Sequence, residues 1–293
     1  MKIGIIGGTG LVGRALAKYL GGKYEIVVFS RRNIVIPGSE VRQMKRPELA
    51  KLADLDVIVN LAGEPIAGVR WSKKTKKKII SSRIGFTTEL VQELEKSEKK
   101  MLLLNASAIG YYGSWSAETR AFSEDDPGAT DFLGKLCLDW ENAALKAKNS
   151  GHKVNLLRTG IVLTREGGAL PKMAFPVKTF LSAEIGSGRQ IMSWIHITDL
   201  VRAIEFIIDK NASGAWNLTA PQAVDNREFT KILGKILKRP TIFPVPGIIL
   251  KLLYSEGAGV LLTGQKVLPS RLQKEGFTFR FNSAEAALRD LLL

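Results

Sequence analysis

The chain has 293 residues and a formal net charge of +15, and its 45% hydrophobic and 24% charged residues are ordinary for a soluble globular protein. Its single cysteine, Cys137, excludes an internal disulfide framework, and with only His152 and His196 beside it we expect no metal site. No run is long and uniform enough to span a membrane, and no hydrophobic signal region precedes the first expected strand. We therefore expect a cytoplasmic protein without a membrane partner.

The first expected strand, Lys2–Ile6, opens onto a glycine-rich turn and then onto an amphipathic helix over Leu11–Leu20. Glycines permit a sharp turn, let the backbone approach phosphates and let the helix pack closely on the sheet. The free N–H groups at the start of the helix then face the anion, supported by the helix dipole. This order predicts a dinucleotide site, with a purely structural turn as the alternative. The glycines are Gly7, Gly8, Gly10 and Gly13.

The second expected strand, Glu25–Ser30, ends on a hydroxyl and runs into Arg31 and Arg32. In an NAD site an acidic residue closes this strand and binds the ribose hydroxyls, and no carboxylate stands at this end. Guanidinium groups suit a 2′-phosphate, because arginine presents a fixed, planar set of donors. The pattern favours NADP over NAD as the cofactor, and a pair of surface arginines is the alternative.

Further apolar runs alternate with helical patterns through the first two thirds of the chain. Buried parallel strands read as continuous β-branched and leucine runs, as these segments do. The alternation predicts an α/β fold, a Rossmann-like doubly wound parallel sheet with its ligand at the carboxyl ends of the strands. The remaining expected strands cover residues 57–61, 101–106 and 154–158, and the expected helices cover 75–95 and 133–148.

Basic charge is concentrated at residues 73–78, where every residue except Thr75 is a lysine. We interpret this run as a solvated helix face. Attraction of anionic cofactors and substrates, or non-specific nucleic-acid binding, are the alternatives. Nucleic acid is the less favoured partner, because no aromatic residues interleave with the lysines to stack bases.

The alternation of strands and helices ends near residue 165, and loop signals follow at 167–171 and 186–190. We expect residues 1–165 to form the NADP-binding domain, to which a helix within 198–212 returns. Residues 166–197 and 213–293 are expected to form a smaller C-terminal domain on the substrate side. The expected partner is a small-molecule substrate, and the expected state is a monomer or homodimer.

Motifs spread from end to end make the chain resemble the extended short-chain dehydrogenase/reductase superfamily. Within it, the chain resembles the "epimerase family" proteins, which carry a C-terminal domain of unknown role. The motifs include Gly-Gly-Thr-Gly-Leu-Val-Gly at 7–13, Asn-Leu-Ala-Gly-Glu-Pro-Ile at 60–66, Ser-Ala-Ile-Gly-Tyr-Tyr-Gly at 107–113, Ser-Trp-Ile-His at 193–196 and Gly-Gln-Lys-Val-Leu-Pro at 264–269.

The resemblance implies cofactor contacts at matching positions of this chain. It places residues 30–31 on the adenosine phosphate, residues 61–62 beside the adenosine ribose and residue 162 near the nicotinamide. Lys78 is basic where the family pattern has an acid, so no contact is carried over to it. The expected cofactor-binding residues are Gly7, Gly8, Thr9, Gly10, Leu11, Val12, Gly13, Ser30, Arg31, Leu61, Ala62, Gly63, Arg83 and Val162.

The catalytic pair of the superfamily, Tyr-x-x-x-Lys on one helix, is missing from its place. The lysine ammonium would lower the tyrosine pKa and make the hydroxyl a usable acid or base. Here the matching positions hold Leu133 and Cys137, and Lys135 is off register. The pair Tyr19 and Lys23 has the spacing but ends the first helix. We assign no catalytic residue.

Two replacements for the missing hydroxyls lie in the motif at 107–113. The catalytic Ser/Thr position falls on Ala108, with Ser107 one residue earlier, and a slip of one residue turns a side chain to the other face of a strand. Tyr111 and Tyr112 offer another hydroxyl, of which Tyr112 is the better candidate. An aromatic ring packed beneath the nicotinamide is the alternative interpretation of Tyr112.

The remaining polar residues are assigned mostly structural roles. Met192 stands where sugar-nucleotide enzymes carry an arginine for the substrate pyrophosphate, which argues against such a substrate. Arg189 is expected on an exposed loop and His196 in a structural position before a helix. Residues 124–126 are expected to form a solvated turn, and Glu64 either lines the site or caps the next turn.

These observations leave three hypotheses for function. The first is an NADP-dependent oxidoreductase or epimerase acting on a small substrate with a non-standard proton donor. The second is an NADP-binding sensor or interaction protein without turnover, suggested by the missing Tyr-x-x-x-Lys pair. The third, a nucleic-acid-associated protein, rests on the net charge and is the least favoured.

Overall fold

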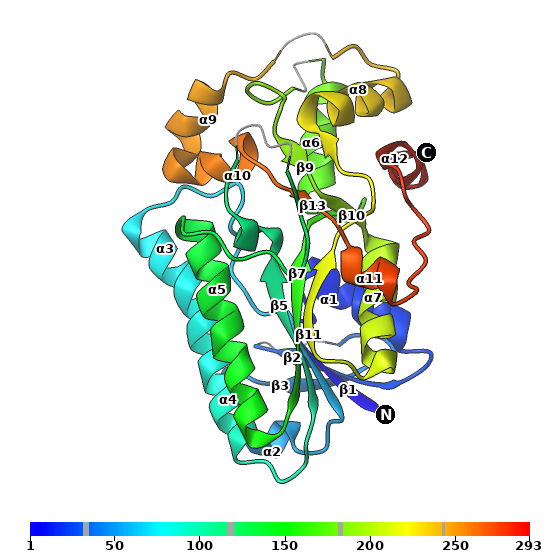
Figure 1. Ribbon diagram of the computed structural model, residues 1–293. Helices are drawn as coiled ribbons and strands as arrows, with labels where there is room; N and C mark the ends of the chain where they lie inside the picture. Colours follow the sequence, from blue (N-terminus) through cyan, green and yellow to red (C-terminus); the bar gives the residue numbers. More distant parts are fainter. Residues whose placement is uncertain (32–34, 116–119, 181–183, 242–243) are drawn as a thin grey trace.

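The computed structural model describes residues 1–31, 35–115, 120–180, 184–241 and 244–293 (Figure 1). Its centre is a sheet of seven strands in the order β11-β7-β5-β4-β1-β2-β3, all parallel. The five apolar runs predicted from the sequence form its five middle strands, so the predicted Rossmann-like sheet is confirmed. The strands are β1 (Lys2–Ile6), β2 (Glu25–Ser30), β3 (Glu40–Gln43), β4 (Val57–Asn60), β5 (Leu102–Ala108), β7 (Lys153–Thr159) and β11 (Gly214–Leu218).

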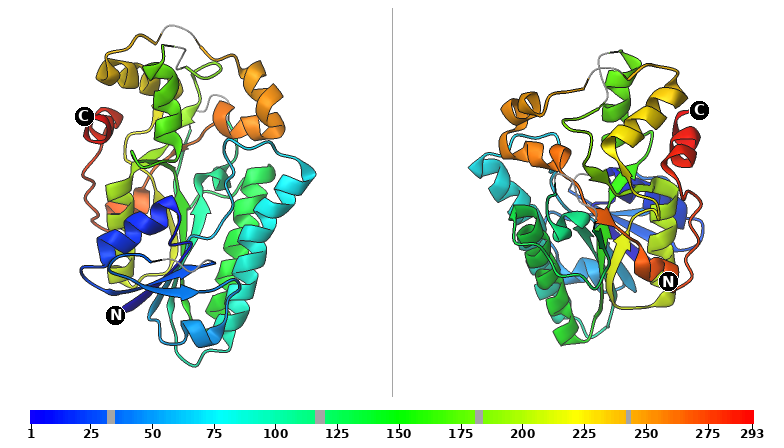
Figure 2. Two further views of the ribbon diagram at one scale, coloured as in Figure 1. Left: turned by 180° about the vertical axis from the view of Figure 1, so that it is seen from behind. Right: turned by 45° about the horizontal axis from the view of Figure 1, so that its top comes forward.

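Helices cover both faces of the sheet, as Figures 1 and 2 show. One face carries α1 (Leu11–Leu20) and α7 (Ile197–Lys210), and the other carries α4 (Phe86–Glu95) and α5 (Phe132–Leu145). The short α2 (Leu49–Leu52) precedes β4. No helix among the described residues is both long enough and apolar enough to cross a bilayer.

The helix predicted over 75–95 is interrupted by a wider turn. It begins as α3 (Lys73–Ile80), passes through one π-helical turn, Ser81–Gly85, and continues as α4. Such turns insert an extra residue into an α-helix and often occur at functional sites. The turn carries Arg83, one of the expected cofactor residues.

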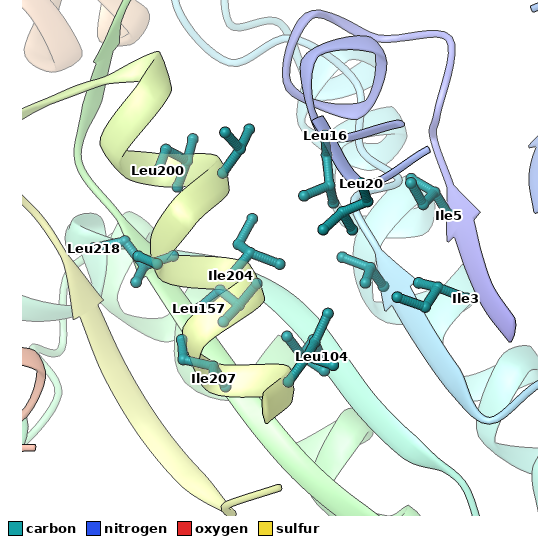
Figure 3. Packing of buried hydrophobic residues seen from close by; sticks show 14 of the residues in the cluster. Ile3, Ile5, Leu16, Leu20, Leu104, Leu157, Leu200, Ile204, Ile207 and Leu218 are labelled. Atoms are coloured by element: carbon teal, nitrogen blue, oxygen red, sulfur yellow. The ribbon is translucent and has the colours of Figure 1, made fainter. Parts of the chain in front are cut away.

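Alternate residues of each central strand enter different cores, because successive side chains of a strand point to opposite faces. Ile3 and Ile5 of β1 pack with Leu16 and Leu20 of α1, whereas Ile6 joins the core on the other face. Helix α7 contributes further buried side chains to the first core, and Figure 3 labels some of them. The labelled ones are Leu200, Ile204 and Ile207.

A smaller lobe is built above the carboxyl ends of the strands (Figure 1). Its own core joins α6, α8 and α12 to the paired strands β8 and β10. Two further two-stranded pairs, β9 with β12 and β6 with β13, tie its loops together. The elements are β6 (Ala121–Phe122), β8 (Ile161–Leu163), α6 (Ala169–Lys178), β9 (Ile191–Met192), β10 (Trp194–His196), β12 (Val224–Asp225), α8 (Asn226–Leu237), β13 (Lys266–Val267) and α12 (Ala284–Leu292).

The C-terminal segment does not stay within this lobe, which corrects the boundary predicted at 213. Residues 214–218 form the edge strand β11 of the main sheet, and α11 (Ser270–Lys274) packs against that strand. The backbone N–H groups of Arg280 and Phe281 donate to the buried carboxylate of Asp199, on α7. The segment therefore contacts both lobes. Its remaining helices, α9 (Gly247–Tyr254) and α10 (Gly259–Leu262), lie at the upper edge of the molecule (Figure 1).

Candidate functional site

A cavity of about 330 Å³ opens where β1, β4, β5 and β7 end. The strand order reverses between β1 and β4, and such a crevice at the carboxyl ends is where doubly wound sheets bind ligands. We call it the central cavity. Its lining residues are Gly7, Gly10, Leu11, Val12, Gly13, Leu61, Ala62, Gly63, Ile66, Arg83, Ala106, Ser107, Ala108, Leu136, Cys137, Trp140, Leu157, Thr159, Leu200 and Ile204.

The glycine turn leaves no room for side chains on its inner side. A Cβ on Gly7, whose φ is +78°, would lie 2.9 Å from the carbonyl group of Leu61. A Cβ on Gly13 would lie 2.4 Å from the carbonyl oxygen of Gly7. Helix α1 follows at once with Gly10 as N-cap and no side chain capping its first N–H groups. Those N–H groups are the ones an anionic group at a helix N-terminus binds.

The loop after β4 is held by a buried amide network. The Oδ1 atom of Asn60 accepts from the N–H of Ala62 at 3.2 Å, and its Nδ2 donates to Asn105 at 2.7 Å and to Thr87 at 3.1 Å. The indole N–H of Trp140 donates to the same Thr87 hydroxyl at 2.9 Å. The bond to Ala62 holds the start of this loop beside the glycine turn, where the carbonyl group of Leu61 lies 2.9 Å from the place of a Cβ on Gly7.

Arg83 carries the charge inside the cavity. Its guanidinium lies 5.2 Å from the ring of Trp140 and against Gly63, where a Cβ would come within 3.0 Å of Cζ. Its Nε atom is buried and has no hydrogen-bond partner among the described residues. Burial lowers the pKa of this group from its ordinary value. A buried donor without a partner costs free energy, so the site fits an anionic or strongly accepting ligand.

A second hollow, of about 400 Å³, adjoins the end of β2 and is here called the basic pocket. Four cationic side chains line it, with Glu64 and Glu89 as the acidic ones. Arg31 is exposed and its nearest guanidinium nitrogen lies 3.9 Å from Glu64, so the charge stays accessible. Arg32 lies outside the described residues. The four cations are Arg31, Lys45, Arg46 and Lys78.

Two of these cations, Lys45 and Arg46, were not singled out from the sequence. They follow β3, a four-residue polar edge strand that carries no apolar run. The N–H of Met44 donates to the carbonyl of Ser30 at 2.8 Å, which brings the start of this basic segment beside the end of β2. A basic pair directly after a short polar segment is the only sequence signal that could have pointed to them.

The positions of the missing Tyr-x-x-x-Lys pair hold no proton donor. Leu133 packs with Trp71 and Ile79 in an apolar cluster. The thiol of Cys137 is 4% exposed, and burial raises its pKa to about 12. Lys135 is exposed to solvent. The cavity lining, within the described residues, contains no tyrosine, lysine, histidine or carboxylate.

Two of the hydroxyls considered as replacements, those of Ser107 and Tyr112, belong to a buried polar chain. Ser107 donates to Oε1 of Glu141 at 2.6 Å, and Glu141 accepts two bonds of 2.9 Å from Arg158. Arg158 also donates to the Tyr112 hydroxyl at 2.9 Å, and that hydroxyl donates to Asn217 at 2.7 Å. Burial raises the pKa of Tyr112 to about 12. Tyr112 is 1% exposed and lies outside the cavity lining, so its role here is structural.

Several other predicted positions are now located. Val162 is half-buried on β8 and does not line the cavity, and Gly8 and Thr9 lie in the turn but outside the lining. His196 caps α7 by accepting from the N–H of Thr198, a structural role. Met192 is buried and Arg189 is exposed on its loop.

The solvated turn predicted at residues 124–126 is wrong for its first residue. The carboxylate of Glu124 is half-buried and accepts from the backbone N–H groups of Asn217 and Arg271. Burial raises the pKa of this carboxyl. It links the loop to two segments far along the chain, which no local pattern reveals. Among the described residues, no group of three or more histidine, cysteine or acidic side chains could hold a metal ion.

A glycine turn, a free helix N-terminus and a basic pocket at the switch point of a parallel sheet define a Rossmann-type nucleotide-binding protein. The chain belongs to the NAD dependent epimerase/dehydratase family, whose model matches residues 3–219. Residues 245–291 match a domain of unknown function, DUF1731.

The chain is similar along its whole length to proteins of one group. It is 38% identical to the chloroplastic epimerase family protein SDR39U1 homolog of Arabidopsis thaliana, covering 100% of this chain and 87% of that one. It is 39% identical to the epimerase family protein Mb2239 of Mycobacterium bovis, covering 98% and 96%. The crystal structure of human epimerase family protein SDR39U1 (isoform 2) with NADPH superposes with a TM-score of 0.88 at 31% identity, covering 99% of each chain.

Proposed function

We propose that this protein binds NADP(H), with the pyrophosphate at the glycine turn and the 2′-phosphate in the basic pocket. The observation that carries the proposal is the glycine turn at Gly7 and Gly13, where nearby backbone atoms leave no room for a side chain. The unpartnered Nε of Arg83, which also lines the central cavity, supports it. The NADPH of the human relative, in a structure of the same fold, supports the choice of cofactor.

The basic pocket accounts for a preference for NADP over NAD. Arg31, Lys45 and Arg46 approach the end of β2, where the adenosine ribose of a Rossmann ligand lies. A hydrogen bond to a charged group contributes about 1.5–3 kcal/mol, so each cation would improve NADP⁺ affinity by about 10- to 150-fold.

Calorimetric titration of the purified protein with NADP⁺ and NAD⁺ tests this assignment. We expect Arg31→Ala to weaken NADP⁺ binding by at least about tenfold and to leave NAD⁺ binding within about threefold. Lys18→Ala, which removes an exposed cation near the far end of α1, is the matched control. Equal losses for both nucleotides in Arg31→Ala would show that the basic pocket does not hold the 2′-phosphate.

We propose further that the protein is an oxidoreductase or epimerase acting on a small substrate with a non-standard proton donor. When bound, the nicotinamide supplies or accepts a hydride. The chain contributes an apolar cavity wall, which excludes water. It also contributes one charged group, Arg83, which orients the cofactor or substrate. Met192 in place of an arginine argues against a nucleotide-sugar substrate.

An NADP-binding sensor without turnover is the second candidate. It is favoured by the buried, neutral thiol of Cys137 at the usual lysine position and by Leu133 at the tyrosine position. NADPH oxidation measured over a panel of small carbonyl compounds separates the two. Oxidation that Arg83→Met abolishes would establish an enzyme, and intact NADPH binding with no oxidation would leave the sensor.

The remaining expectations on partners and location stay proposals. We propose a monomer or homodimer with no role in nucleic-acid binding. A cytoplasmic location is our proposal for this chain, although the Arabidopsis relative is named chloroplastic. Light scattering and cell fractionation would test the assembly and the location.

A further inference from the structure

Helix α9 (Gly247–Tyr254) has the sequence Gly-Ile-Ile-Leu-Lys-Leu-Leu-Tyr, yet none of its residues is buried. Ile248, Ile249, Leu252 and Leu253 are exposed to 64%, 46%, 71% and 57%. Their spacing places them on one side of the helix, because residues four apart lie one turn above each other. Clustered apolar exposure of this kind on a folded protein marks an interaction surface. We call these four residues the apolar face of α9.

The lysine-rich helix α3 is joined to α9 through the residues that precede it. The backbone N–H of Trp71 donates to the carbonyl of Tyr254, and the guanidinium of Arg70 donates to the carbonyl of Leu252, both at 3.3 Å. An ion pair between Lys76 and Glu256 adds a third link. Figures 1 and 2 show α3 and α9 at the same edge of the molecule.

The lysines of this edge are free to meet an external anion. Lys73, Lys74 and Lys77 of α3 and Lys251 of α9 are exposed, and within the described part of the chain no acidic side chain lies within ion-pair distance of any of them. The edge thus combines an apolar face with unneutralised positive charge. Helices that lie in a membrane interface have this composition, with leucine-type residues in the acyl boundary and lysines toward the headgroups.

We propose that α9 and the start of α3 dock this protein reversibly on the surface of anionic lipid bilayers. The apolar face of α9 enters the headgroup boundary, and the four lysines contact the anionic headgroups. Helix α9 has eight residues and a span needs about 20, so the protein lies on the bilayer and does not cross it. The expectation of no membrane partner came from the lack of a spanning run and is revised here.

Charge decides between a bilayer and the other possible occupants of this face. A second copy of the chain would bring the same lysines and a net charge of +15 to the contact, and like charges repel. Nucleic acid would match the lysines, but its exposed surface is mostly phosphate and sugar and offers little apolar area to four aliphatic side chains. An anionic bilayer complements both the charge and the apolar face. This inference does not depend on the proposed function.

Sedimentation of the full-length chain with vesicles tests the proposal. We expect the partition coefficient on vesicles containing 30% phosphatidylglycerol to exceed that on pure phosphatidylcholine by at least tenfold, and to fall when salt rises from 0.1 to 0.5 M. Leu252→Glu with Leu253→Glu should lower binding to the anionic vesicles by at least tenfold. The triple change Lys73→Gln, Lys74→Gln and Lys77→Gln should lower it while leaving the apolar face intact.

Leu293→Glu is the matched control, because this exposed leucine ends the chain on the side of the molecule opposite α9 (Figure 1). It should bind anionic vesicles like the wild type. Circular dichroism checks that each variant is folded. Equal sedimentation with both kinds of vesicle, or undiminished binding by folded variants of α9 and α3, would overturn the proposal. A dimer in light scattering that Leu252→Glu converts to a monomer would also overturn it, because a second copy would then cover α9.

Discussion

We expect that breaking the buried ion pair between Glu141 and Arg158 lowers the free energy of unfolding more than breaking any other polar contact in the fold. The two side chains are 4% and 5% exposed and are joined by two bonds of 2.9 Å. Although burial disfavours its charge, the bonds to Glu141 raise the pKa of Arg158 from its ordinary value. Glu141→Gln keeps the shape of the acid and removes its charge, so it isolates the electrostatic contribution.

The magnitude follows from the bonds that the change disrupts. A glutamine amide offers one acceptor oxygen to three donors, those of Ser107 and of two Arg158 nitrogens, and turns its own N–H group toward the guanidinium. Hydrogen bonds to charged groups contribute about 1.5–3 kcal/mol each, and breaking one partner of a buried pair costs about 3–5 kcal/mol. We expect Glu141→Gln to lower the free energy of unfolding by about 3–5 kcal/mol.

Urea unfolding followed by tryptophan fluorescence measures this loss, with an unchanged slope indicating that only the midpoint has moved. The double change Glu141→Met with Arg158→Met should recover much of it, because removing both charges leaves no buried ion unpaired. A loss below about 1 kcal/mol for Glu141→Gln would refute the reasoning. So would a double variant whose loss of stability equals the sum of the losses in Glu141→Met and Arg158→Met measured singly.

Three further changes have definite expected results. Gly13→Ala should weaken NADP⁺ binding more than tenfold in calorimetry, because its Cβ would meet backbone atoms of Gly7, whereas Gly22→Ala, whose Cβ has open space, should not. Burial lowers the pKa of His196, so the unfolded chain takes up its proton first as pH falls through about 6.5. The wild type should then lose stability between pH 7.5 and 5.5 relative to His196→Asn, which keeps the helix cap; equal urea midpoint shifts would contradict this. Cys137 should react with a thiol reagent at pH 8 only after unfolding, and fast labelling of the native protein would show that the cavity opens.

The central strands could be predicted from the sequence, because each buried strand is a continuous run of apolar residues. The ranges 57–61 and 101–106 match β4 and β5 within two residues at each end, and Lys2–Ile6 and Glu25–Ser30 match without change. Both faces of these strands are covered, so their residues are continuously apolar. The glycine turn was also predicted correctly from its spacing, and the need for Gly13 arises within the turn, where its Cβ would meet the carbonyl oxygen of Gly7, whereas Gly7 itself lies against the distant Leu61.

The rest depended on contacts between distant segments. Strand β3 is polar and short because it lies at the sheet edge, so Lys45 and Arg46 could not be assigned to the basic pocket. No characteristic sequence pattern marks the π-helical turn that carries Arg83, so the turn could not be predicted. Ser107, a candidate hydroxyl, is bonded to Glu141, and that pairing joins β5 to a helix 34 residues away. Sequence could name these residue types but not their partners.

The path of the C-terminal segment bears on how this protein could be divided. The first family model ends at residue 219 and the second begins at residue 245, which suggests two separable modules. Yet the backbone N–H of Arg271 donates to Glu124, and the backbone N–H of Phe281 donates to Asp199, in the first turn of α7. A fragment that stops before residue 245 would leave both carboxylates without these donors, and a fragment that starts there would have no sheet of its own to fold against. We therefore expect neither fragment to fold by itself, although the two family models divide the chain between them.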